Sequence, residues 1–518
     1  MNHSELRRSV GGLFCVGFPD ADANQALLDE LVDLTPGGVI LFDRNISDVE
    51  RTRAFVESLL RAIPGNSPIV AVDQEGGRVA HAPGLAKRIP SAMALGAIDD
   101  VALVERVADR IGRELCAIGA NVDFAPVADL AVEPRNTVIG TRAFGGDPDR
   151  VGCFTASFIA GLRSGGIAAV TKHLPGHGGT VGDSHRELPC LEVDWETLEA
   201  RELLPFRAAI SAGSQGIMTA HIVVPALDAS APATLSSTTS RTLLRENLGF
   251  SGVCVTDCLE MAAIAETVGV TRGAILALVA GADLLLVSRH IHRAREARDA
   301  IVKAVEIGEL PIERVIEASA RVQRFRNGLP GLRQPLVEEE GEDLAAVVTR
   351  RSLTAPRDMA VLRAEMPVTI LSFEKKTDRE TPGQEGIERF SLNLALRRRR
   401  VRSEVMRVPL DPSDAMIAHL QELITLQSDR ELILLIRRAH VYEAQRRAIE
   451  MLLAHRPSAL VISLAEPFDL ALVPQARRVL CTFGECEATV EALADALVGK
   501  LIPTGRLPVS LAPPGRIL

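Results

Sequence analysis

The chain has 518 residues, of which 47% are hydrophobic and 24% charged, and its formal net charge is −9. This composition excludes a disordered chain, and the length predicts more than one domain. The acidic balance gives no reason to expect nucleic acid or a membrane as a partner, so we expect neither. Four consecutive arginines at 397–400 are an exception, but such a run usually lies on a solvated face.

The first eighteen residues and the cysteines predict a cytoplasmic protein. The apolar stretch near the start is too short and too glycine-rich to span a membrane, and it lacks a small-residue cleavage site of the signal-peptide type. The eight cysteines show no CxxC spacing, and several lie within apolar runs. Reduced thiols are therefore the simplest interpretation, and we expect no zinc site made from them.

Short apolar runs alternate with longer amphipathic segments between residues 10 and 290. The runs are typical of strands buried on both faces of a parallel sheet. They lie at residues 12–18, 37–42, 69–73, 121–129, 167–173, 216–224, 252–257 and 282–288. Between the fifth and sixth runs, a helix is predicted with Asp194 as its N-cap and Gly213 as its stop. Eight strand–helix units favour a TIM-like (β/α)8 barrel over a doubly wound open sheet.

The second half of the chain predicts a connector and a smaller domain. After a helical stretch from about residue 290, the sequence becomes acidic and proline-containing, which is typical of a connector. Four further strand-like runs then alternate with helical segments, as in a layered α/β domain, at residues 368–373, 432–439, 459–464 and 478–483. We predict a barrel domain at 1–330, a linker at 331–347 and a second α/β domain at 348–518.

Polar side chains end five of the predicted barrel strands. They are Asp73, Asp129, Lys172 with His173, His221 and Asp257. In a TIM-like barrel, active sites are built at this rim. One charged residue there would be weak support, because charged residues are common at strand ends, but five strands agree.

The segment at 171–188 contains three histidines. Pro175 and the neighbouring glycines forbid a continuous helix, so His173 and His177 cannot form a helical metal-binding pair. The glycines also do not match a phosphate-binding loop. We therefore expect no metal and no cofactor, and we assign His177 to loop structure.

Asp183 and His185, two residues apart in the same segment, form a candidate acid/base pair. In an extended or turning segment the two side chains can face the same side, and a carboxylate stabilises a neighbouring imidazolium. Such a pair suits proton transfer near neutral pH. The alternative is an aspartate that accepts backbone N–H groups beside a surface histidine, which is the commoner arrangement for an isolated D-x-H.

Three other residues have a chemical and a structural interpretation. Asp257 is a candidate nucleophile or charge stabiliser, or else a cap for the helix that follows it. Asp73 precedes a tight glycine turn and could bind substrate or cap that turn. Arg142 could bind a hydroxyl or carboxylate group, or form a surface ion pair. Together with an acid/base, these groups are what a retaining glycoside hydrolase needs.

Five motifs resemble those of the glycoside hydrolase family 3 β-N-acetylglucosaminidases. In chain order they are AVDQEGGRVAHAPG at 71–84, VIGTRAFGGDP at 138–148, TKHLPGHGGTVGDSHRELP at 171–189, GIMTAHIVVPALD at 216–228 and VTDCLEMAAI at 255–264. The resemblance covers nearly all of residues 10–290. The tail at 499–511 resembles the end of that family's C-terminal α/β/α sandwich domain, so the resemblance implies a barrel followed by a sandwich.

The resemblance also implies roles for individual residues. Asp257 would be the nucleophile, and His185 the acid/base with Asp183 as its partner. Asp73, Arg142, Lys172 and His173 would bind the sugar. His81 stands where close relatives often carry an arginine, and we include it among the expected substrate-binding residues.

The implied activity is that of a retaining exo-glycosidase that removes terminal β-linked N-acetylglucosamine. The substrate would be a small glycoside or oligosaccharide containing N-acetylglucosamine, and peptidoglycan recycling and chitin fragments are both compatible with it. One Trp and one Tyr predict a short polar pocket with few stacking platforms. Cys258, after the expected nucleophile, favours the hexosaminidase branch, because family 3 β-glucosidases usually carry Trp there.

Three questions stay open at this level. A β-N-acetylglucosaminide phosphorylase is one alternative, since an imidazole acid/base would not repel phosphate as a glutamate would. A catalytically silent sugar-binding protein is another, although intact Asp257, Asp183 and His185 argue against it. The second domain could shape the substrate cleft or pair two subunits, so a homodimer is an open option.

Overall fold

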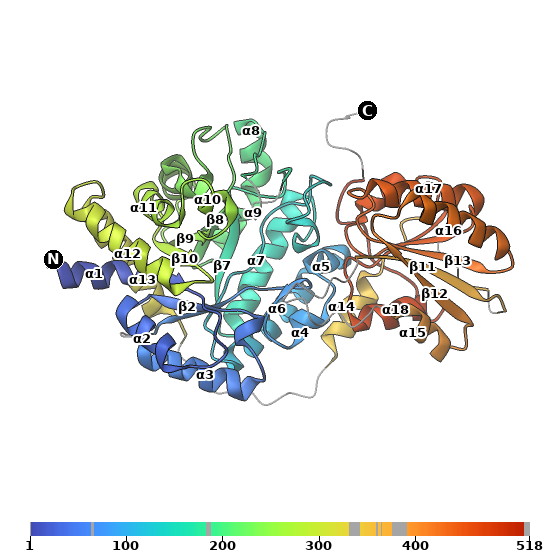
Figure 1. The fold of residues 1–518 in the computed structure, drawn as a ribbon, viewed down its shortest axis with the longest axis horizontal. Helices are drawn as coiled ribbons and strands as arrows, with labels where there is room; N and C mark the ends of the chain where they lie inside the picture. Colours follow the sequence, from blue (N-terminus) through green and yellow to red (C-terminus); the bar gives the residue numbers. More distant parts are fainter. Residues whose placement is uncertain are drawn as a thin grey trace.

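The computed structural model describes residues 2–63, 67–182, 188–330, 342–358, 361–363, 365–375 and 391–511. Figure 1 shows two bodies side by side, a barrel drawn from blue to yellow-green and a second α/β domain drawn in orange and red. Among the described residues, no helix is long and apolar enough to cross a membrane.

Eight strands form a closed barrel in which every neighbouring pair is parallel. They are β1 (Phe14–Val16), β2 (Gly38–Leu41), β3 (Ile69–Val72), β6 (Val122–Asp123), β7 (Ala168–Leu174), β8 (Gly216–Thr219), β9 (Val253–Cys258) and β10 (Leu284–Val287). Almost every strand residue is buried, because helices cover the outer face and side chains fill the interior. The predicted (β/α)8 barrel is confirmed.

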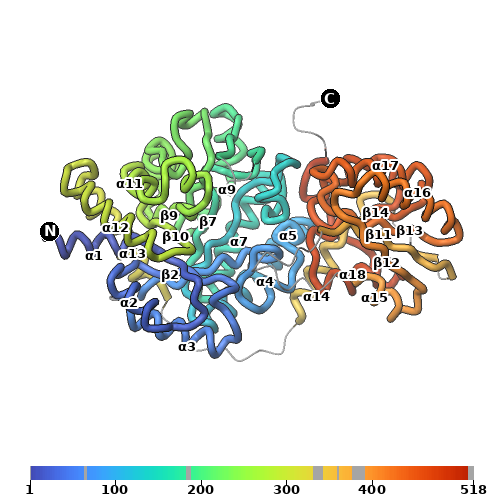
Figure 2. The backbone as a smooth tube through the Cα atoms, in the orientation of Figure 1, coloured from blue at the N-terminus to red at the C-terminus, as the bar shows by residue number. Residues whose placement is uncertain are grey.

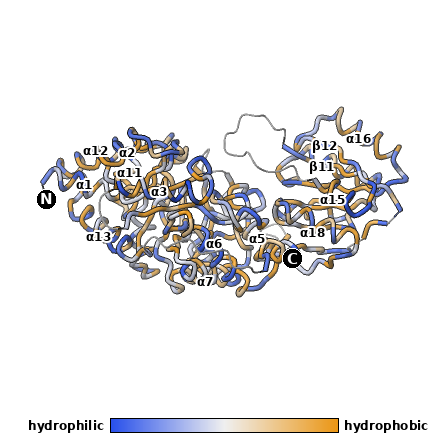
Figure 3. The backbone as a smooth tube through the Cα atoms, turned by 90° about the horizontal axis from the view of Figure 1, so that it is seen from below, coloured by the Kyte–Doolittle hydropathy of each residue, from blue (hydrophilic) through white to orange (hydrophobic). Residues whose placement is uncertain are grey.

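Amphipathic helices surround the barrel, and Figure 3 shows hydrophobic and hydrophilic positions alternating along outer helices such as α1 and α12. The helices are α1 (His3–Gly11), α2 (Gln25–Leu34), α3 (Val49–Ala62), α4 (Leu85–Arg88), α5 (Ala92–Ile98), α6 (Val101–Ala117), α7 (Pro148–Ser164), α8 (Trp195–Thr197), α9 (Leu204–Ser211), α10 (Ala262–Ala265), α11 (Val270–Ala280), α12 (Ile291–Glu306) and α13 (Ile312–Gly328). Asp194 caps α8 by accepting the Thr197 N–H at 2.8 Å, as predicted. A π-helical turn joins α8 to α9, and Gly213 follows α9 in a left-handed conformation with φ +85°.

One predicted strand was too long at the rim. The run at 121–129 is a strand only over its first part, since β6 ends at Asp123 and Pro126 has no N–H for the ladder. Asp129 therefore lies on the loop after β6 and not at a strand end. The structure also adds a short antiparallel hairpin, β4 (Gln74–Gly76) with β5 (Val79–Ala80), directly after β3.

The second domain is a parallel five-stranded sheet with the order β12-β11-β13-β14-β15. Its strands are β11 (Val368–Glu374), β12 (Ser403–Pro409), β13 (Glu431–Ile436), β14 (Leu460–Ser463) and β15 (Arg478–Cys481), and its helices are α14 (Leu344–Ser352), α15 (Leu392–Arg398), α16 (Asp414–Leu426), α17 (Glu443–His455) and α18 (Glu487–Leu497). Along β13, Leu432 and Leu434 belong to the core cluster that includes α16 and α17, whereas Ile433 and Leu435 belong to the cluster of α15 and α18. Helices therefore cover both faces, which confirms the α/β/α sandwich.

The second domain contacts the barrel through hydrogen bonds to backbone carbonyl groups. The Ser91 hydroxyl beside α5 donates to Phe483 O after β15 at 2.5 Å, and the tail returns to the barrel where Arg506 N donates to Ala97 O at 2.8 Å. In Figure 2, α5 and α14 lie between the two bodies. Residues 331–341 lie outside the described residues, so the domain boundaries at 330 and 348 stay predictions.

Candidate active site

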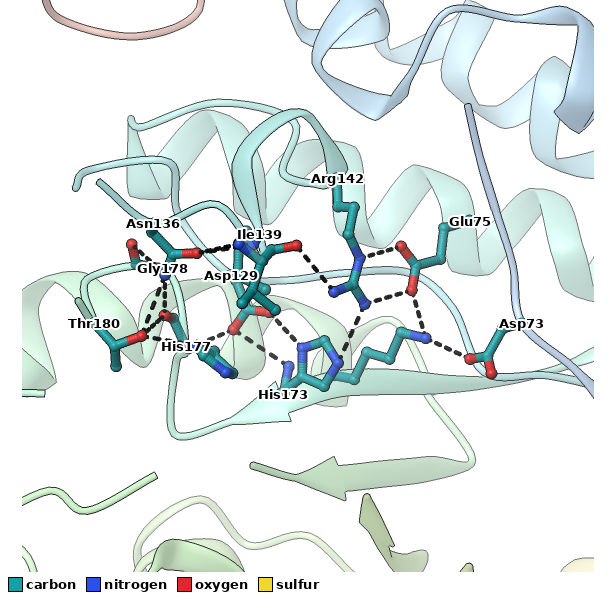
Figure 4. A network of polar contacts seen from close by, with 12 residues as sticks. Asp73, Glu75, Asp129, Asn136, Ile139, Arg142, His173, His177, Gly178 and Thr180 are labelled. Atoms are coloured by element: carbon teal, nitrogen blue, oxygen red, sulfur yellow. Dashed lines mark hydrogen bonds and ion pairs between the residues drawn. The ribbon is translucent and has the colours of Figure 1, made fainter. Parts of the chain in front are cut away.

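Four of the five predicted substrate-binding residues lie at or next to the carboxyl ends of the barrel strands. Asp73 directly follows β3, and Lys172 and His173 are part of β7. Arg142 reaches the same place from a 3-10 turn, Gly140–Arg142, in the loop after β6. Figure 4 shows these groups joined in one continuous polar network.

Lys172 lies at the centre of this network. Its ammonium group is 2.5 Å from Asp73 Oδ1 and 2.6 Å from Glu75 Oε1, and its side chain is only 3% exposed. Burial by itself would lower the pKa of Lys172, but the carboxylates of Asp73 and Glu75 outweigh burial and raise it above its ordinary value. Lys172 is therefore a permanent cation that can donate to a hydroxyl group.

Glu75 joins Lys172 to Arg142, and sequence reasoning did not single it out. The Arg142 guanidinium donates from Nε to Glu75 Oε2 and from Nη2 to Glu75 Oε1, both at 2.7 Å. Burial by itself would raise the pKa of Glu75, but Arg142 and Lys172 lower it far below the usual range. A bidentate pair of this kind fixes the guanidinium plane. The available signal was the position of Glu75, two residues after Asp73 in one rim segment.

His173 is held by Asp129, which the sequence placed at the rim without a chemical role. His173 Nδ1 lies 2.6 Å from Asp129 Oδ2, and the fully buried Asp129 also accepts the His177 N–H at 2.7 Å. The other ring nitrogen, Nε2, lies 3.4 Å from Arg142 Nη2. Because a guanidinium can only donate, Nε2 accepts and the His173 proton lies on Nδ1.

The loop after β7 is fixed to the loop that carries Arg142. Asn136 donates from its amide to His177 O at 2.8 Å, while its Oδ1 accepts the Ile139 N–H at 2.8 Å (Figure 4). His177 Nδ1 is 2.9 Å from Thr180 Oγ1 inside the loop. Burial lowers the pKa of His177 to about 4, so this imidazole is neutral near pH 7. These contacts agree with the structural role expected for His177.

Asp183 and His185, the predicted acid/base pair, lie outside the described residues. The described chain reaches Gly182 and resumes at Leu188. On either side, Val181 and Cys190 form an antiparallel bridge, and Cys190 pairs with Val223 after β8. The roles of Asp183 and His185 therefore stay predictions.

Asp257 is half-buried on β9, two barrel strands away from β7. Its Oδ1 accepts the Cys258 N–H at 2.6 Å. The fully buried His221, after β8, has Nε2 2.9 Å from Cys258 O and Nδ1 2.9 Å from Thr234 Oγ1. The carbonyl can only accept, so Nε2 donates, and His221 fixes the backbone that carries Asp257.

His81, the fifth predicted substrate-binding residue, is directed toward β2. Its ring contacts Phe42 at a centroid distance of 5.0 Å, and Nδ1 is 3.5 Å from Asp43 Oδ2. Its backbone N–H donates to Gln74 Oε1 at 2.7 Å, which places it on the hairpin that follows Asp73. The structure thus brings its backbone, but not its imidazole, next to the Lys172 network.

The second domain reaches the loop that carries Arg142. Glu466, which follows β14 and is 2% exposed, pairs with Arg438 at 3.2 Å. A Cβ atom built on Gly140, which has φ +45°, would collide with the Glu466 carboxylate.

Among the described residues, no group of three His, Cys, Asp or Glu side chains is arranged to hold a metal ion.

Comparisons with known proteins agree with this architecture. The family described as the glycosyl hydrolase family 3 N terminal domain matches residues 5–325. The solved glycoside hydrolase family 3 beta-N-acetylglucosaminidase from Paenibacillus sp. str. FPU-7 is 32% identical with a TM-score of 0.88, and the match covers 98% of this chain and 99% of that one. A beta-hexosaminidase of Methylococcus capsulatus is 38% identical over 273 residues, which are 52% of this chain and 79% of that protein. Beta-hexosaminidase LpqI of Mycobacterium tuberculosis is 34% identical over 338 residues, 63% of this chain and 84% of that protein.

Proposed function

The chain belongs to glycosyl hydrolase family 3 and is a glycoside hydrolase, and we propose that it removes terminal β-linked N-acetylhexosamine with retention of configuration. The observation that carries this proposal is the network of Asp73, Glu75, Lys172, Arg142 and His173 at the barrel rim that also carries Asp257. It combines fixed donors and acceptors for sugar hydroxyls with a separate carboxylate for the chemistry. The names of the relatives support an acetamido sugar.

The sugar-binding roles follow from which groups are already paired. The Arg142 guanidinium and the Glu75 carboxylate form a bidentate pair, so these two residues hold the geometry of the site. Asp73 uses Oδ1 for Lys172, while Oδ2 has no partner among the residues that the structure describes and the side chain is 18% exposed. Asp73 and Lys172 are therefore the groups we assign to the sugar hydroxyls, with His173 beside them.

We assign the covalent step to Asp257. His185, as the imidazolium, donates its proton to the glycosidic oxygen while an Asp257 oxygen bonds to the anomeric carbon and the glycosidic C–O bond breaks. His185 then accepts a proton from water, whose oxygen attacks the anomeric carbon and releases Asp257. Each of the two steps inverts the configuration at the anomeric carbon, so the released sugar has the same configuration as the substrate. Asp183 stabilises the imidazolium and orients it.

Kinetics on aryl glycosides test the specificity. We expect kcat/KM for an aryl β-N-acetylglucosaminide to exceed that for the aryl β-glucoside by at least about 100-fold, because a site that binds an amide rejects the analogue that lacks it. A preference for the glucoside would refute the proposed substrate. In phosphate buffer, free N-acetylglucosamine as the product supports hydrolysis, whereas the sugar 1-phosphate would show a phosphorylase.

Azide rescue tests the two catalytic assignments separately. In Asp257→Ala, azide can attack from the face of the missing carboxylate and give a glycosyl azide of inverted configuration. In His185→Ala, azide can attack the glycosyl-enzyme and give an azide of retained configuration. Unchanged turnover by Asp257→Ala, or the opposite stereochemistry in either variant, would contradict the assignments.

For the natural substrate, we propose cytoplasmic glycans with a terminal N-acetylglucosamine, such as recycled peptidoglycan fragments. The support is that the eight cysteines, all of which lie among the described residues, are thiols without a disulfide and only Cys153 is exposed, which suits a reducing compartment. Mass spectrometry of digests of muropeptides and chitin oligosaccharides decides between the two sources. Faster release from chitin fragments would overturn the peptidoglycan assignment.

A further inference from the structure

Asp123, the last residue of β6, lies beneath the sugar-binding network. Its side chain is fully buried, and its residue pairs in register with Val72 of β3 and Ala169 of β7. Asp123 Oδ1 accepts the Gln74 N–H at 2.9 Å. Gln74 is the residue between Asp73 and Glu75, so this bond fixes the backbone between the two carboxylates that bind Lys172.

The side chain of Gln74 extends the same support. Its amide group donates to Ala82 O at 2.9 Å, and its Oε1 accepts the N–H groups of His81 and Ala82. One end of Gln74 thus holds the β4–β5 hairpin, and its backbone N–H is held by Asp123. A shift of Asp123 would move Asp73 and Glu75 together.

The second oxygen of Asp123 is in an unusual position. Asp123 Oδ2 is buried and has no hydrogen-bond partner among the residues that the structure describes. Asp73 and Glu75 are balanced by Lys172 and Arg142, so a third carboxylate would have no cation of its own. Burying an unpaired charge is far more costly than burying a neutral carboxylic acid.

We propose that Asp123 is a positioning residue for Asp73 and Glu75 and that it does this as a neutral carboxylic acid. Oδ1 is the carbonyl oxygen that accepts from Gln74, and Oδ2 carries the proton. This inference rests on the proposed function, since it concerns how the sugar-binding carboxylates are held. Loss of the proton would place a third negative charge beside Asp73 and Glu75 and draw Lys172 away from them.

The charges around Asp123 agree with a neutral acid. The pKa of Asp123 is raised to about 8, and burial is the largest cause. The charges of Asp73 and Glu75 also raise this pKa, whereas the Gln74 N–H and Lys172 lower it. Lys172 of β7 stays charged throughout. Burial, with a smaller electrostatic contribution from Asp73, raises the pKa of the Cys15 thiol on β1, so this thiol stays protonated. Of Asp123, Lys172 and Cys15, only Asp123 therefore changes charge between pH 7 and pH 9.

The test is the pH dependence of KM for an aryl β-N-acetylglucosaminide. In the wild-type enzyme, KM should rise by up to about tenfold between pH 7 and pH 9 as Asp123 ionises. Asp123→Asn keeps an acceptor for Gln74 and cannot ionise, so its KM should be flat and close to the wild-type value at pH 7. Asp123→Ala removes the acceptor, so its KM should be raised roughly 5- to 100-fold at every pH.

Asp283→Asn is the matched control. Asp283 is also fully buried, but it precedes β10 and pairs with Arg245 and Arg314 at the opposite end of the barrel. Its variant should keep the wild-type KM profile. An alkaline rise in KM that persists in Asp123→Asn, or that is absent from the wild type, overturns the inference.

Infrared spectroscopy gives a readout that does not depend on activity. The pH-difference spectrum of the wild type between pH 7 and pH 9 should show the loss of a protonated carboxylic acid band, and this band should be absent from Asp123→Asn. No such band in the wild type overturns the inference, even if Asp123→Asn does not fold. A wild type with the band but without hexosaminidase activity would refute the proposed function and leave the neutral acid in place.

Discussion

Replacement of Glu75 by glutamine tests whether the buried charge network holds the side chains that we propose bind the sugar. Glu75 is 3% exposed and contacts both Lys172 and Arg142. In the variant, Lys172 keeps Asp73, but Arg142 loses a bidentate partner and stays in a buried site. The buried Arg142 guanidinium, left without an ionised partner, accounts for most of the lost free energy of unfolding.

The structure sets the size of this effect. Removal of one partner from a buried ion pair costs about 3–5 kcal/mol, and the glutamine oxygen, as a remaining acceptor, favours the lower end. We expect the unfolding midpoint of the barrel to fall by roughly 6–10 °C. Burial raises the pKa of Glu75, but Arg142 and Lys172 outweigh it and lower the pKa. The stabilisation is therefore present above the ordinary glutamate pKa and is lost as the pH falls below it.

Calorimetry and initial-rate kinetics at pH 7 measure the two effects. A loss of about 3 kcal/mol in transition-state binding corresponds to roughly a 100-fold lower kcat/KM. Asp283→Asn also removes a buried, ion-paired carboxylate, so it should lower the midpoint while kcat/KM stays within about threefold of wild type. If Glu75→Gln retained wild-type kcat/KM, the network would not be what holds the sugar-binding groups.

Two further predictions concern the loops around the network. Gly140→Ala introduces a Cβ at φ +45° against Glu466, so it should lower both the midpoint and kcat/KM. The same substitution should cost less when it is made in Glu466→Ala than in the wild type; an equal cost would mean that backbone strain alone is responsible. Between pH 6.5 and about pH 4, His177 is protonated in the unfolded chain but stays neutral in the folded protein, because its pKa is lowered by burial. The free energy of unfolding should therefore fall by roughly 2 kcal/mol from pH 7 to pH 5 because of this residue. Denaturant titration of His177→Asn should show a smaller fall, and an equal fall would show that His177 is not responsible.

The fold could be predicted from the sequence because its signals are local. Eight apolar runs with helical segments between them define a parallel barrel, since each strand must be buried on both faces. The edge strand β12 was missed because Glu404, Met406 and Arg407 are exposed or half-buried and make no continuous apolar run. Edge strands carry one unpaired side, so their sequences tolerate polar residues.

The site could be predicted only in part. Asp73, Lys172 and His173 were named as candidates because the carboxyl ends of parallel strands share one rim, and Arg142 was named as a group that could bind a hydroxyl or carboxylate. Glu75 was not singled out, and Asp129 was placed at the rim without a role. Glu75 contacts Lys172, which lies 97 positions later in the chain, and Asp129 contacts His173, which lies 44 positions later. A local sequence pattern carries no information about contacts over such separations.

By itself, the sequence determined the barrel, the family and the kinds of group available at the rim, because hydrophobic periodicity and motif order are properties of the chain. Only the tertiary structure decided which charges meet. Lys172 is paired with Asp73 and Glu75, and Arg142 with Glu75, whereas Asp123 has no ion pair among the described residues. Whether a buried carboxyl group is a charge or a neutral acid depends on the partners within a few ångströms, and folding alone brings those partners together.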